Sequence, residues 1–461
     1  MFNPSIFKAY DIRGIYGTDF DDEFAYQLGK TFVEWRQSEL NHHQLNIGVS
    51  SDMRLSSPNL KSALIKGMLA AGATVLDYGL CSTPTFYFGV AGTKADGGIQ
   101  ISASHNPKED NGFKLVRELA KPIGENNGLK DLAAKFADAS VPTAAQLIQD
   151  NAELPGRLEA YPDILTASAT ADWASGDWSA IKPFKIIADP ANGMGALYLD
   201  ELFKKLPCSL TRLNWDLDGS FPAHQADPFQ AKNLEQLSAA IVKAGADLGI
   251  ATDGDADRLF FVDETGRALT AGVTRAILCQ LFLAERPGAK IGYDIRPGRI
   301  TPETILAHGG VPVLTRVGHS LIKEQMLKED IYFAGESSGH FFLNLPDGCF
   351  ERPMTMILHF LRALSLSGQK LSEFAAPYAK YFDSGEINNR VADVSKVLAT
   401  LKTKYSDGEL NELDGVSITY PEWWFNVRAS NTEPLVRLNL EAVSQKIMEE
   451  KRDEVLETIK N

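Results

Sequence analysis

The sequence predicts an α/β protein made of three consecutive doubly wound α/β domains and a C-terminal α+β domain. With 461 residues the chain is long for one hydrophobic core, and ordinary domain sizes suggest about three or four domains. Strand and helix patterns alternate and then restart near residues 184 and 289, whereas the last part shows strands followed by one charged helix. We therefore expect domains at residues 1–152, 153–265, 266–378 and 379–461.

The first domain begins with an amphipathic helix. Apolar residues recur at positions 24, 28, 32 and 35, a spacing that predicts a helix over residues 24–35. A second helix is expected over residues 60–71. Apolar runs bounded by turn residues predict strands at residues 46–50, 73–76, 99–101 and 112–116. The polar, alanine-rich stretch from residue 120 to 153 has few large apolar residues and closes the domain.

The later domains repeat this alternation until the C-terminal part changes it. The second domain is expected to hold a helix that ends near residue 206 and strands at residues 184–189, 247–251 and 259–262. The third is expected to hold a helix over residues 301–307 and strands at residues 289–294, 311–314 and 331–334. The last domain is expected to hold strands at residues 416–420, 424–428 and 435–441.

Composition and charge narrow the class of function. The chain has 44% hydrophobic and 23% charged residues, as globular proteins usually do. Its formal net charge of -14 disfavours nucleic acid as a partner, because phosphate-backbone binding needs a basic face. A small phosphorylated ligand held by a few converging cations is still allowed. The cysteines are far apart and form no CxxC pair, which disfavours zinc and a disulfide framework; they are Cys81, Cys208, Cys279 and Cys349.

The N-terminus and the hydropathy pattern bear on location. The first residues lack the basic segment and apolar core of a signal peptide. No apolar run reaches the roughly 18 residues that a membrane span requires. We therefore expect a cytoplasmic protein with no membrane partner.

A polar cluster follows the predicted strand at residues 99–101 and organises the rest of the interpretation. Ser102, Ser104, His105 and Asn106 come directly after the strand, and Pro107 prevents a helix from starting there. We expect residues 102–106 to form a tight exposed loop, with Ser104 as the residue that carries the chemistry. By itself this cluster is more often an ordinary turn.

A second polar cluster supplies what a nucleophilic serine needs. Asp253, Asp255 and Asp257 alternate after the strand at residues 247–251. An EF-hand is excluded because the sixth position is Arg258 instead of glycine and both flanks are strand-like. Three carboxylates on one strand-end loop suit Mg²⁺, which prefers carboxylates together with a phosphate oxygen. The adjacent Arg258 indicates a phosphate near the metal.

Two further loops follow later strands. Residues 335–340 combine glycines with a carboxylate and hydroxyls that suit sugar hydroxyl groups. Residues 428–432 offer a guanidinium and short donors that suit a phosphate. Each of these would more often be a turn by itself. Gly29-Lys30-Thr31 is no P-loop, because Phe24 stands where the first glycine belongs, so we do not expect ATP as phosphate donor.

Together these clusters resemble one family, the α-D-phosphohexomutases, and within it the phosphomannomutase/phosphoglucomutase group. The resemblance rests on five motifs that span the whole chain in the family's order: Tyr10-Asp11-Ile12-Arg13-Gly14, Ser102-Ala103-Ser104-His105-Asn106-Pro107, Asp253-Gly254-Asp255-Ala256-Asp257-Arg258, Gly335-Glu336-Ser337-Ser338-Gly339-His340 and Arg428-Ala429-Ser430-Asn431-Thr432. Each motif alone is moderately specific, and five in order are strong.

The resemblance implies a four-domain enzyme in which one loop of each domain faces a central cleft. It implies that Ser104 is phosphorylated, that one Mg²⁺ lies against this phosphate, and that hexose 6-phosphate and hexose 1-phosphate are interconverted through a 1,6-bisphosphate. The bisphosphate is also the expected activator. Mannose phosphates, and glucose phosphates as well, are the expected substrates, and the protein is expected to be a monomer. Phosphoryl transfer needs mainly alignment and charge neutralisation, which these clusters can supply.

The resemblance also assigns residues. Those with catalytic roles are Arg13, Ser104, His105, Lys114, Arg258 and His340. Those expected to hold the metal are Ser104, Asp253, Asp255 and Asp257. Those expected to bind substrate are Tyr10, Arg296, His319, Glu336, Ser337, Ser338, Gly339, His340, Arg428, Ala429, Ser430, Asn431 and Thr432.

Several alternatives stay open at this point. The general base is not assigned, and a structural role is possible for each histidine. Arg296 stands where relatives often have lysine, so a planar fork replaces a point charge. The competing functions are a phosphoglucosamine mutase, an inactive sugar-phosphate-binding protein of the same fold and a phosphatase.

Overall fold

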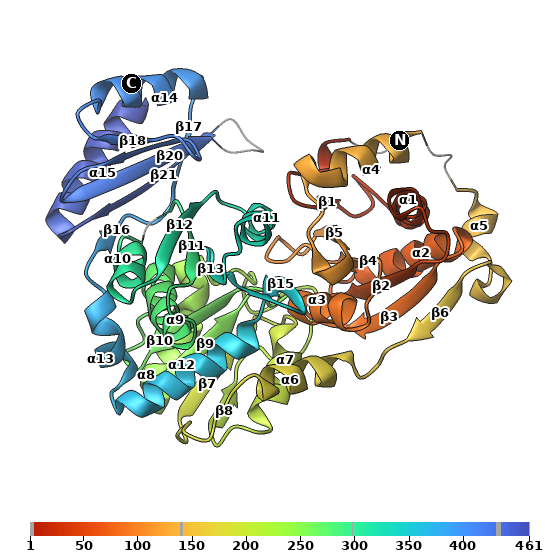
Figure 1. The fold of residues 1–461 in the computed structure, drawn as a ribbon, viewed down its shortest axis with the longest axis horizontal. Helices are drawn as coiled ribbons and strands as arrows, with labels where there is room; N and C mark the ends of the chain where they lie inside the picture. The colour runs from red at the N-terminus through yellow and green to blue at the C-terminus, as the bar shows by residue number, and fades with distance from the viewer. Residues whose placement is uncertain (1–3, 139–141, 297, 430–434, 461) are drawn as a thin grey trace. The chain divides into compact units, whose positions relative to one another are not determined.

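The structure is a computed structural model that describes residues 4–138, 142–296, 298–429 and 435–460. The chain divides into two compact units, and Figure 1 labels their helices and strands. The first consists of Met1–Ala268 and Gly339–Leu371, and the second of Leu269–Ser338 and Ser372–Asn461. Each unit is described by itself.

The first unit begins with a six-stranded sheet in the order β1-β5-β4-β2-β3-β6. Strands β2, β3, β4 and β6 are parallel, whereas β5 is antiparallel to its neighbours β4 and β1. The last strand, β6, lies beyond residue 152, where the sequence placed a domain boundary, and still pairs with β3. The strands are β1 (Ile12–Ile15), β2 (Asn46–Ser51), β3 (Thr74–Leu80), β4 (Gly97–Ile101), β5 (Asp110–Arg117) and β6 (Arg157–Ala160).

Helices cover both faces of this sheet. Helices α1 (Asp22–Leu40), α2 (Ser57–Ala70) and α4 (Lys130–Ala137) bury one hydrophobic cluster against it, and α3 (Thr83–Gly92) buries a second cluster that includes Tyr78 and Val116 (Figure 1). Helices α1 and α2 approach closely at two glycines, Gly29 of α1 and Gly67 of α2. A Cβ at Gly29 would lie 2.2 Å from the Leu64 carbonyl oxygen, so this glycine serves helix packing.

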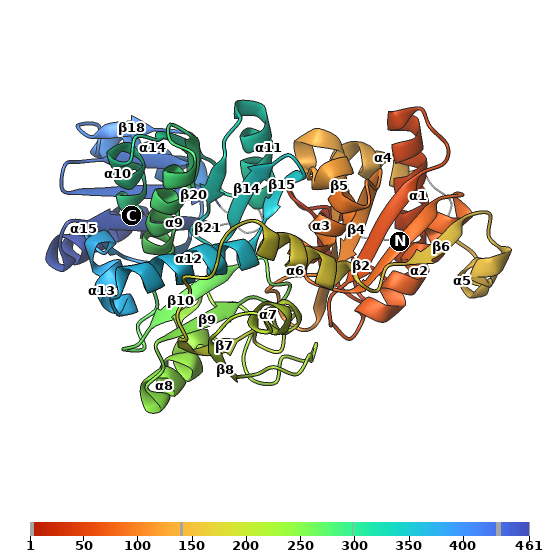
Figure 2. The same ribbon diagram turned by 60° about the horizontal axis from the view of Figure 1, so that its bottom comes forward.

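The second sheet of this unit has the order β10-β9-β7-β8, with only β10 antiparallel. Figure 2 shows α8 on one side of these strands and α12 on the other. Side chains alternate accordingly along β10, because Phe260 packs in the cluster under α8 while Phe261 stacks on Phe360 of α12 with ring centroids 4.0 Å apart. The elements are β7 (Lys185–Asp189), β8 (Ser209–Arg212), β9 (Leu248–Thr252), β10 (Leu259–Asp263), α6 (Ile164–Ala174), α7 (Gly195–Phe203), α8 (Glu235–Ala244) and α12 (Pro353–Ser367).

An antiparallel hairpin completes the first unit. Its strands are β14 (Phe341–Leu345) and β15 (Gly348–Glu351). His340 precedes the first strand and Glu351 ends the second, so the hairpin brings both residues to one end. The backbone of His340 also forms an isolated bridge with that of Arg258.

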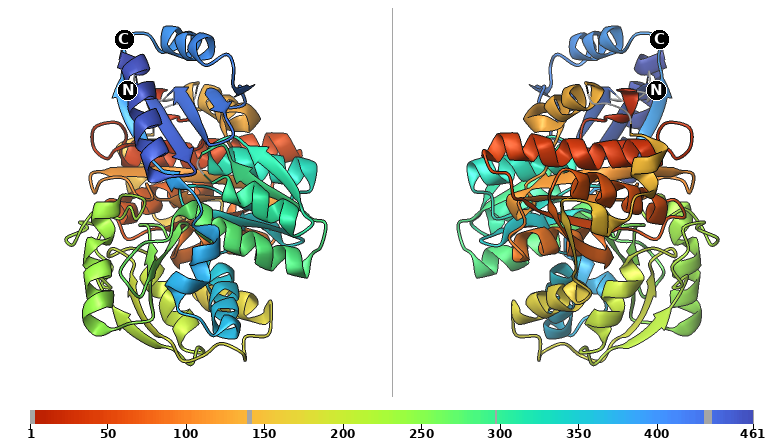
Figure 3. Two further views of the ribbon diagram at one scale, coloured as in Figure 1. Left: turned by 90° about the vertical axis from the view of Figure 1, so that its left-hand side faces the viewer. Right: turned by 90° about the vertical axis from the view of Figure 1, so that its right-hand side faces the viewer.

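The second unit contains one parallel and one antiparallel sheet. The parallel strands β12, β11 and β13 are accompanied by three helices. The C-terminal sheet is antiparallel, and α14 and α15 pack together on it (Figure 3). The elements are α9 (Ala271–Glu285), β11 (Lys290–Asp294), α10 (Ile300–Ala307), β12 (Val311–Thr315), α11 (His319–Glu329), β13 (Phe333–Gly335), β16 (Phe382–Asp383), β17 (Ile387–Arg390), α14 (Val394–Lys404), β18 (Glu409–Asn411), β19 (Val416–Thr419), β20 (Trp423–Ala429), β21 (Leu435–Ala442) and α15 (Gln445–Lys460).

The predicted fold class, three successive α/β domains and a C-terminal α+β domain, is confirmed. The predicted strands agree with the observed ones to within a few residues, as at 99–101 for β4 and 435–441 for β21. The sequence patterns assigned neither α9 nor α12, because both are apolar on most sides and lack a polar face. In the described part of the chain, every helix is too short or too polar to cross a membrane. The predicted cleft and the domain boundaries stay predictions.

Candidate active site

The loop that carries Ser104 follows β4 directly. Ser104 has a φ of 51°, in the left-handed region that residues with a side chain seldom adopt. The prediction of an exposed loop is wrong, because Ser102 is fully buried and Ser104 is only 2% exposed. The loop after β9 covers it: a Cβ at Gly254 would lie 2.5 Å from the Ser104 carbonyl oxygen. The two loops are therefore packed backbone to backbone.

Three carboxylates lie beside this serine. The Ser104 hydroxyl donates a hydrogen bond to Asp253 Oδ2 at 2.7 Å. Asp253, Asp255 and Asp257 each offer a carboxylate oxygen, and these three oxygens lie within 4.8 Å of one another. The three side chains are essentially buried, which is costly for carboxylates without compensating charge. The loop after β9 thus concentrates negative charge against the Ser104 hydroxyl.

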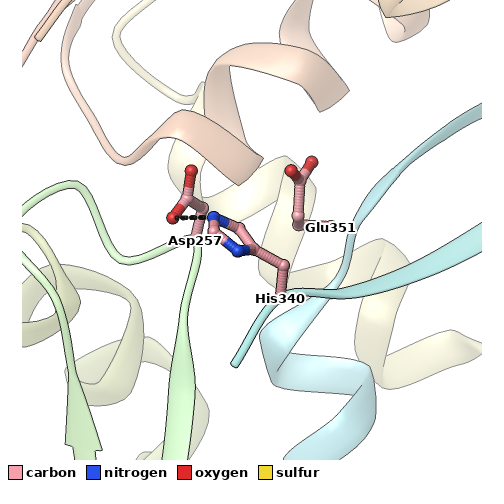
Figure 4. A group of neighbouring side chains, drawn as sticks. All are labelled: Asp257, His340 and Glu351. Carbon is pink, nitrogen blue, oxygen red and sulfur yellow. Dashed lines mark ion pairs between the residues drawn. The ribbon is translucent and has the colours of Figure 1, made fainter. Parts of the chain in front are cut away.

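Two basic side chains neutralise part of this charge. Lys114 on β5 places Nζ 2.7 Å from Asp255 Oδ2 and 2.7 Å from Asp257 Oδ2. His340 places Nε2 3.0 Å from Asp257 Oδ1, and Figure 4 marks this pair with a dashed line. Burial opposes the charge of Lys114, but Asp255 and Asp257 outweigh it and raise its pKa well above the ordinary value. Lys114 is therefore an ammonium throughout the physiological pH range.

His105 connects Ser104 to Arg258. Its Nδ1 lies 3.2 Å from Ser104 Oγ, and its Nε2 lies 3.4 Å from Arg258 Nη2. Because a guanidinium can only donate, Nε2 must accept, and the proton of a neutral ring is then on Nδ1, facing Ser104. Burial lowers the pKa of His105 well below its ordinary value, and the charges of Arg258 and Arg13 lower it further. A neutral His105 therefore donates a hydrogen bond from Nδ1 to Ser104 Oγ.

Arg258 and Arg13 flank the serine loop. Arg258 Nη1 donates to Asp227 Oδ1 at 3.1 Å, which fixes the guanidinium beside His105. Arg13 on β1 donates to the Ala103 carbonyl at 3.1 Å and to Asn106 Oδ1 at 2.7 Å. Tyr10 is half-buried in the bend that precedes β1. Arg13 therefore contacts the backbone of the loop, whereas Arg258 lies beside the reacting side chains.

The chemistry of the carboxylates fits a small divalent cation. Burial raises the pKa of Asp253 well above its ordinary value, and repulsion from Asp257 and Asp255 raises it further. Burial acts the same way on Asp257, but Lys114 and His340 outweigh it and hold the pKa of Asp257 well below its ordinary value. Asp255 Oδ1 is buried and has no hydrogen-bond partner in the described part of the chain. A cation with oxygen ligands would relieve both the repulsion and the unsatisfied oxygen.

A second group with possible metal ligands shares Asp257. Asp257, His340 and Glu351 each have a ligand atom within 4.8 Å of the others, and Figure 4 shows His340 lying between the two carboxylates. An imidazole among the ligands is typical of transition metals, whereas oxygen ligands alone suit Mg²⁺. Ser104 hydrogen-bonds to the three-aspartate group, which makes that group the candidate for a metal in phosphoryl transfer.

The second unit holds two further groups of predicted residues. Arg296 Nε lies 2.6 Å from Asp294 Oδ2 and its Nη2 lies 3.0 Å from Glu336 Oε1. Glu336 Oε1 also accepts from the backbone N–H of Gly318, at 2.9 Å. Because position 296 holds arginine instead of lysine, its planar guanidinium can bridge the carboxylates of Asp294 and Glu336. Ser337 Oγ donates to Asp294 Oδ1 at 2.7 Å, and His319 is half-buried at the start of α11.

The predicted phosphate-binding residues are near the end of β20. Arg428 donates to Glu386 at 2.7 Å, and Arg437 donates to the other oxygen of Glu386 at 3.3 Å. Ala429 is exposed at the end of the strand, and Ser430, Asn431 and Thr432 lie outside the described residues. Burial would raise the pKa of Glu386, but Arg428, Arg296 and Arg437 outweigh it and lower that pKa. A carboxylate thus lies where arginines could otherwise bind an anion.

Models of one protein family match the chain from end to end. They are the four domains of phosphoglucomutase/phosphomannomutase, namely the α/β/α domains I, II and III at residues 4–140, 164–266 and 273–381 and the C-terminal domain at residues 386–458. The phosphomannomutase of Methanocaldococcus jannaschii is 38% identical, over 98% of this chain and 96% of its own length. The chain belongs to the phosphoglucomutase/phosphomannomutase family.

Other relatives agree with this family. The phosphohexose mutases of Xanthomonas campestris are 37% identical over 94% of both chains. A crystal structure of a phosphoglucomutase/phosphomannomutase family protein from Burkholderia thailandensis superposes with a TM-score of 0.87 at 30% identity, covering 99% of this chain and 97% of that one. Membership confirms the predicted family and the predicted class of enzyme, a mutase.

Within the phosphoglucomutase/phosphomannomutase fold, the first unit gathers the predicted serine, metal and acid–base residues. The predicted sugar loop is divided between the units, since Glu336, Ser337 and Ser338 belong to the second and Gly339 and His340 to the first. Sequence reasoning did not identify several side chains that contact the predicted site residues or their loops. The missed side chains of the first unit are Arg54, Thr83, Asp227 and Glu351, and those of the second unit are Arg275, Asp294 and Glu386.

One signal could have found some of the missed residues. Arg54 and Thr83 follow strands β2 and β3 as the polar clusters follow β4 and β9, at the edge where parallel strands end. Thr83 donates its hydroxyl to Asp255 Oδ2 at 2.7 Å, and its backbone N–H to the Asp255 carbonyl at 3.0 Å. A polar residue that directly follows a parallel strand is therefore a site candidate even where no motif surrounds it.

Proposed function

We propose that the protein is a phosphohexomutase that interconverts hexose 6-phosphate and hexose 1-phosphate through a phosphorylated Ser104. The observation that carries the proposal is the placement of Ser104 Oγ, 2.7 Å from Asp253 and 3.2 Å from a neutral His105 in a buried acidic site. Phosphoryl transfer depends on such alignment and on charge neutralisation. The 38% identity to a phosphomannomutase over nearly the whole chain supports the same reaction.

The bonds and protons of the transfer step can be followed on residues of this chain. A sugar hydroxyl oxygen attacks the phosphorus, and the bond from phosphorus to Ser104 Oγ breaks. The proton lost by the sugar hydroxyl passes to Oγ as it leaves, and the neutral His105 donates a hydrogen bond from Nδ1 to Oγ. In the second transfer Ser104 Oγ attacks the other phosphate of the 1,6-bisphosphate, the bond from that phosphorus to the sugar oxygen breaks, and the proton of the Ser104 hydroxyl passes to the sugar oxygen. Arg258 faces the transferring oxygens and stabilises their charge.

Asp253, Asp255 and Asp257 would hold one Mg²⁺, with the phosphate on Ser104 as a further ligand. The ion supplies positive charge for the phosphoryl oxygens. Lys114 supplies positive charge to the same carboxylates, and His340 holds Asp257 from the other side. No ATP is required in this cycle, and hexose 1,6-bisphosphate is the expected activator because it phosphorylates Ser104.

The substrate class follows from the loops of the second unit. Glu336 and Ser337 suit the 3- and 4-hydroxyls of the sugar, and Arg428 suits its phosphate. These hydroxyls have the same orientation in mannose and glucose, so we propose that both hexose phosphates are substrates. Phosphoglucosamine is a second candidate, favoured only by the same loop chemistry. A small acidic substrate, and not nucleic acid, is in keeping with the net charge of -14. A cytoplasmic monomer stays our expectation.

The test is turnover together with the mass of the protein. The purified protein should convert mannose 1-phosphate and glucose 1-phosphate to 6-phosphates, and intact mass should show one phosphoryl group. Ser104→Ala should lose the phosphoryl group and at least about a thousandfold of kcat, because the acceptor oxygen is gone. Ser56→Ala, which removes a hydroxyl that accepts from Asn111 at 2.8 Å, is the matched control.

Three outcomes would redirect the assignment. Release of inorganic phosphate in proportion to substrate loss would identify a phosphatase. Binding without turnover would identify an inactive sugar-phosphate-binding protein. Full activity of Ser104→Ala would remove Ser104 from the mechanism.

A further inference from the structure

Arg54 is a fully buried arginine whose guanidinium donates most of its hydrogen bonds to the serine loop, the segment of residues 102–110 that carries Ser104. It lies between β2 and α2, and its side chain is 0% exposed. Nη1 donates to the carbonyl oxygens of Pro107 at 2.6 Å and of Asp110 at 2.8 Å. Nη2 donates to those of Ser104 at 2.8 Å and of Asn106 at 2.7 Å. Four of the five N–H groups of the guanidinium thus point at the backbone of one loop.

The rest of the surroundings fix Arg54 in this position. Its Nε lies 3.3 Å from Asp52 Oδ2, and Asp52 Oδ1 accepts from the Arg54 backbone N–H at 3.0 Å. The guanidinium carbon lies 5.1 Å from the ring centroid of Phe221. A Cβ at Gly219 would lie 2.6 Å from Arg54 Cα, so the chain of the neighbouring segment passes close behind it. Arg54 therefore cannot swing away from the loop without moving these neighbours.

The loop needs support at Ser104. A non-glycine residue with a φ of 51° keeps this conformation only where the surroundings impose it. The N–H of Ser104 is held by Ser102 Oγ at 2.9 Å, and the carbonyl is held by Arg54. These two bonds fix the direction of the Cα–Cβ bond, and Oγ lies 2.7 Å from Asp253 Oδ2. The two backbone bonds therefore place the Ser104 side chain where its hydroxyl can reach Asp253.

We infer that Arg54 is a positioning residue for Ser104: its fork of hydrogen bonds holds the serine loop in the conformation that aims Oγ at the metal-binding carboxylates. The inference rests on the proposed function insofar as Ser104 carries the phosphoryl group. Within the described residues, the Arg54 guanidinium donates its hydrogen bonds to the loop that carries Ser104 and none to the predicted sugar loop or phosphate loop. Its loss should therefore slow the chemical step and leave substrate binding nearly unchanged.

Arg36 on α1 provides a matched control beside the same sheet. Its side chain is 1% exposed, and it donates to the Asp96 carbonyl from Nε at 3.0 Å and from Nη2 at 2.7 Å. Asp96 precedes the first residue of β4, whereas Ser104 follows its last one. Arg36→Gln and Arg54→Gln therefore remove the same buried group from opposite ends of one strand. Both should lose stability, but only one should change the serine loop.

The experiment compares wild type, Arg54→Gln and Arg36→Gln by kinetics and by hydrogen exchange of the peptide that covers residues 102–111. For Arg54→Gln we expect kcat to fall by about a hundredfold or more, KM to stay within about threefold, and exchange in the loop to rise by about tenfold. For Arg36→Gln we expect kcat within about threefold and unchanged exchange in the loop. Unfolding in urea shows that both variants are folded under assay conditions.

The result that overturns the inference is a folded Arg54→Gln protein with kcat within about threefold of wild type or with unchanged exchange in the loop. If Arg54→Gln does not fold, Arg54→Lys replaces it, because an ammonium keeps the charge but cannot form the planar fork. If neither folds, Arg54 is structural and the inference fails. If wild type converts no hexose phosphate, the proposed function fails, and loop exchange alone decides the role of Arg54.

Discussion

The Lys114 ammonium lies 2.7 Å from a carboxylate oxygen of Asp257, which is 143 positions further along the chain in the loop after β9. Asp255 Oδ2 lies at the same distance from the ammonium. Lys114 therefore occupies part of the space in which a divalent cation would meet these carboxylates, and the two cations compete for the same negative charge.

This competition predicts the behaviour of Lys114→Met. The variant leaves three buried carboxylates with less positive charge, so the metal-free protein should be less stable than wild type, while its affinity for Mg²⁺ should rise by roughly tenfold or more. The measurement is the shift in melting temperature with Mg²⁺ concentration, together with calorimetric titration. Lys121→Met, which removes a half-exposed lysine paired with Glu118, is the control for net charge. Weaker Mg²⁺ binding by Lys114→Met would mean that Lys114 does not oppose the ion.

Removal of the metal should stop turnover. Dialysis against EDTA should abolish mutase activity and added Mg²⁺ should restore it, because the ion acts on charge in the transition state. Asp255→Asn should lower kcat by about a hundredfold or more with a much smaller change in KM. Asp216→Asn, at an exposed position, makes the same charge change away from the site. Activity that survives prolonged dialysis would refute the metal assignment.

His224 predicts a pH-dependent contribution to stability. Its Nε2 lies 3.1 Å from Asp189 Oδ2, and this hydrogen bond raises the pKa of His224 although burial opposes it. A raised histidine pKa stabilises the folded state fully below the unfolded pKa of about 6.5, and the effect fades as pH rises through the folded pKa. His224→Gln should therefore cost more stability at about pH 5.5 than at about pH 8.5, by less than about 1 kcal/mol.

Urea unfolding at the two pH values measures this difference. The matched background is Asp189→Asn, in which the carboxylate is replaced by a neutral amide of similar shape. In that background the cost of His224→Gln should no longer depend on pH. An equal cost at both pH values in the wild-type background would show that the pair does not stabilise the fold through charge.

Specificity tests the predicted sugar loop. If Glu336 contacts only hydroxyls that mannose and glucose share, Glu336→Ala should lower kcat/KM for both hexose phosphates by similar factors. The wild-type efficiencies for the two sugars should lie within about a hundredfold of each other. Glu329→Ala, at the end of α11, is the control. Strong turnover of mannose 1-phosphate without any glucose 1-phosphate activity would show that another residue reads the 2-hydroxyl.

The reactive side chains at the strand ends could be predicted because each group of them is adjacent in the sequence. Ser104, Asp253, Asp255 and Asp257 were identified from polar clusters that follow apolar runs, a pattern set by local periodicity. The same reasoning failed on exposure: it assumed that a polar loop faces water, and Ser104 is 2% exposed. Burial depends on what packs over a loop, and the covering segment at Gly254 is 150 positions away in the chain.

The sequence by itself determined the succession of α/β domains, the serine and the three carboxylates, because strand periodicity and strand-end residues are local properties. The tertiary structure alone decided which partners these residues meet. Ser104 meets Asp253 across 149 positions and Arg54 across 50, and Lys114 becomes an ion-pair partner only when β5 lies beside the loop after β9. A guanidinium reaches four carbonyl oxygens only after two strands are paired in register, and such a contact depends on distances that no local pattern encodes.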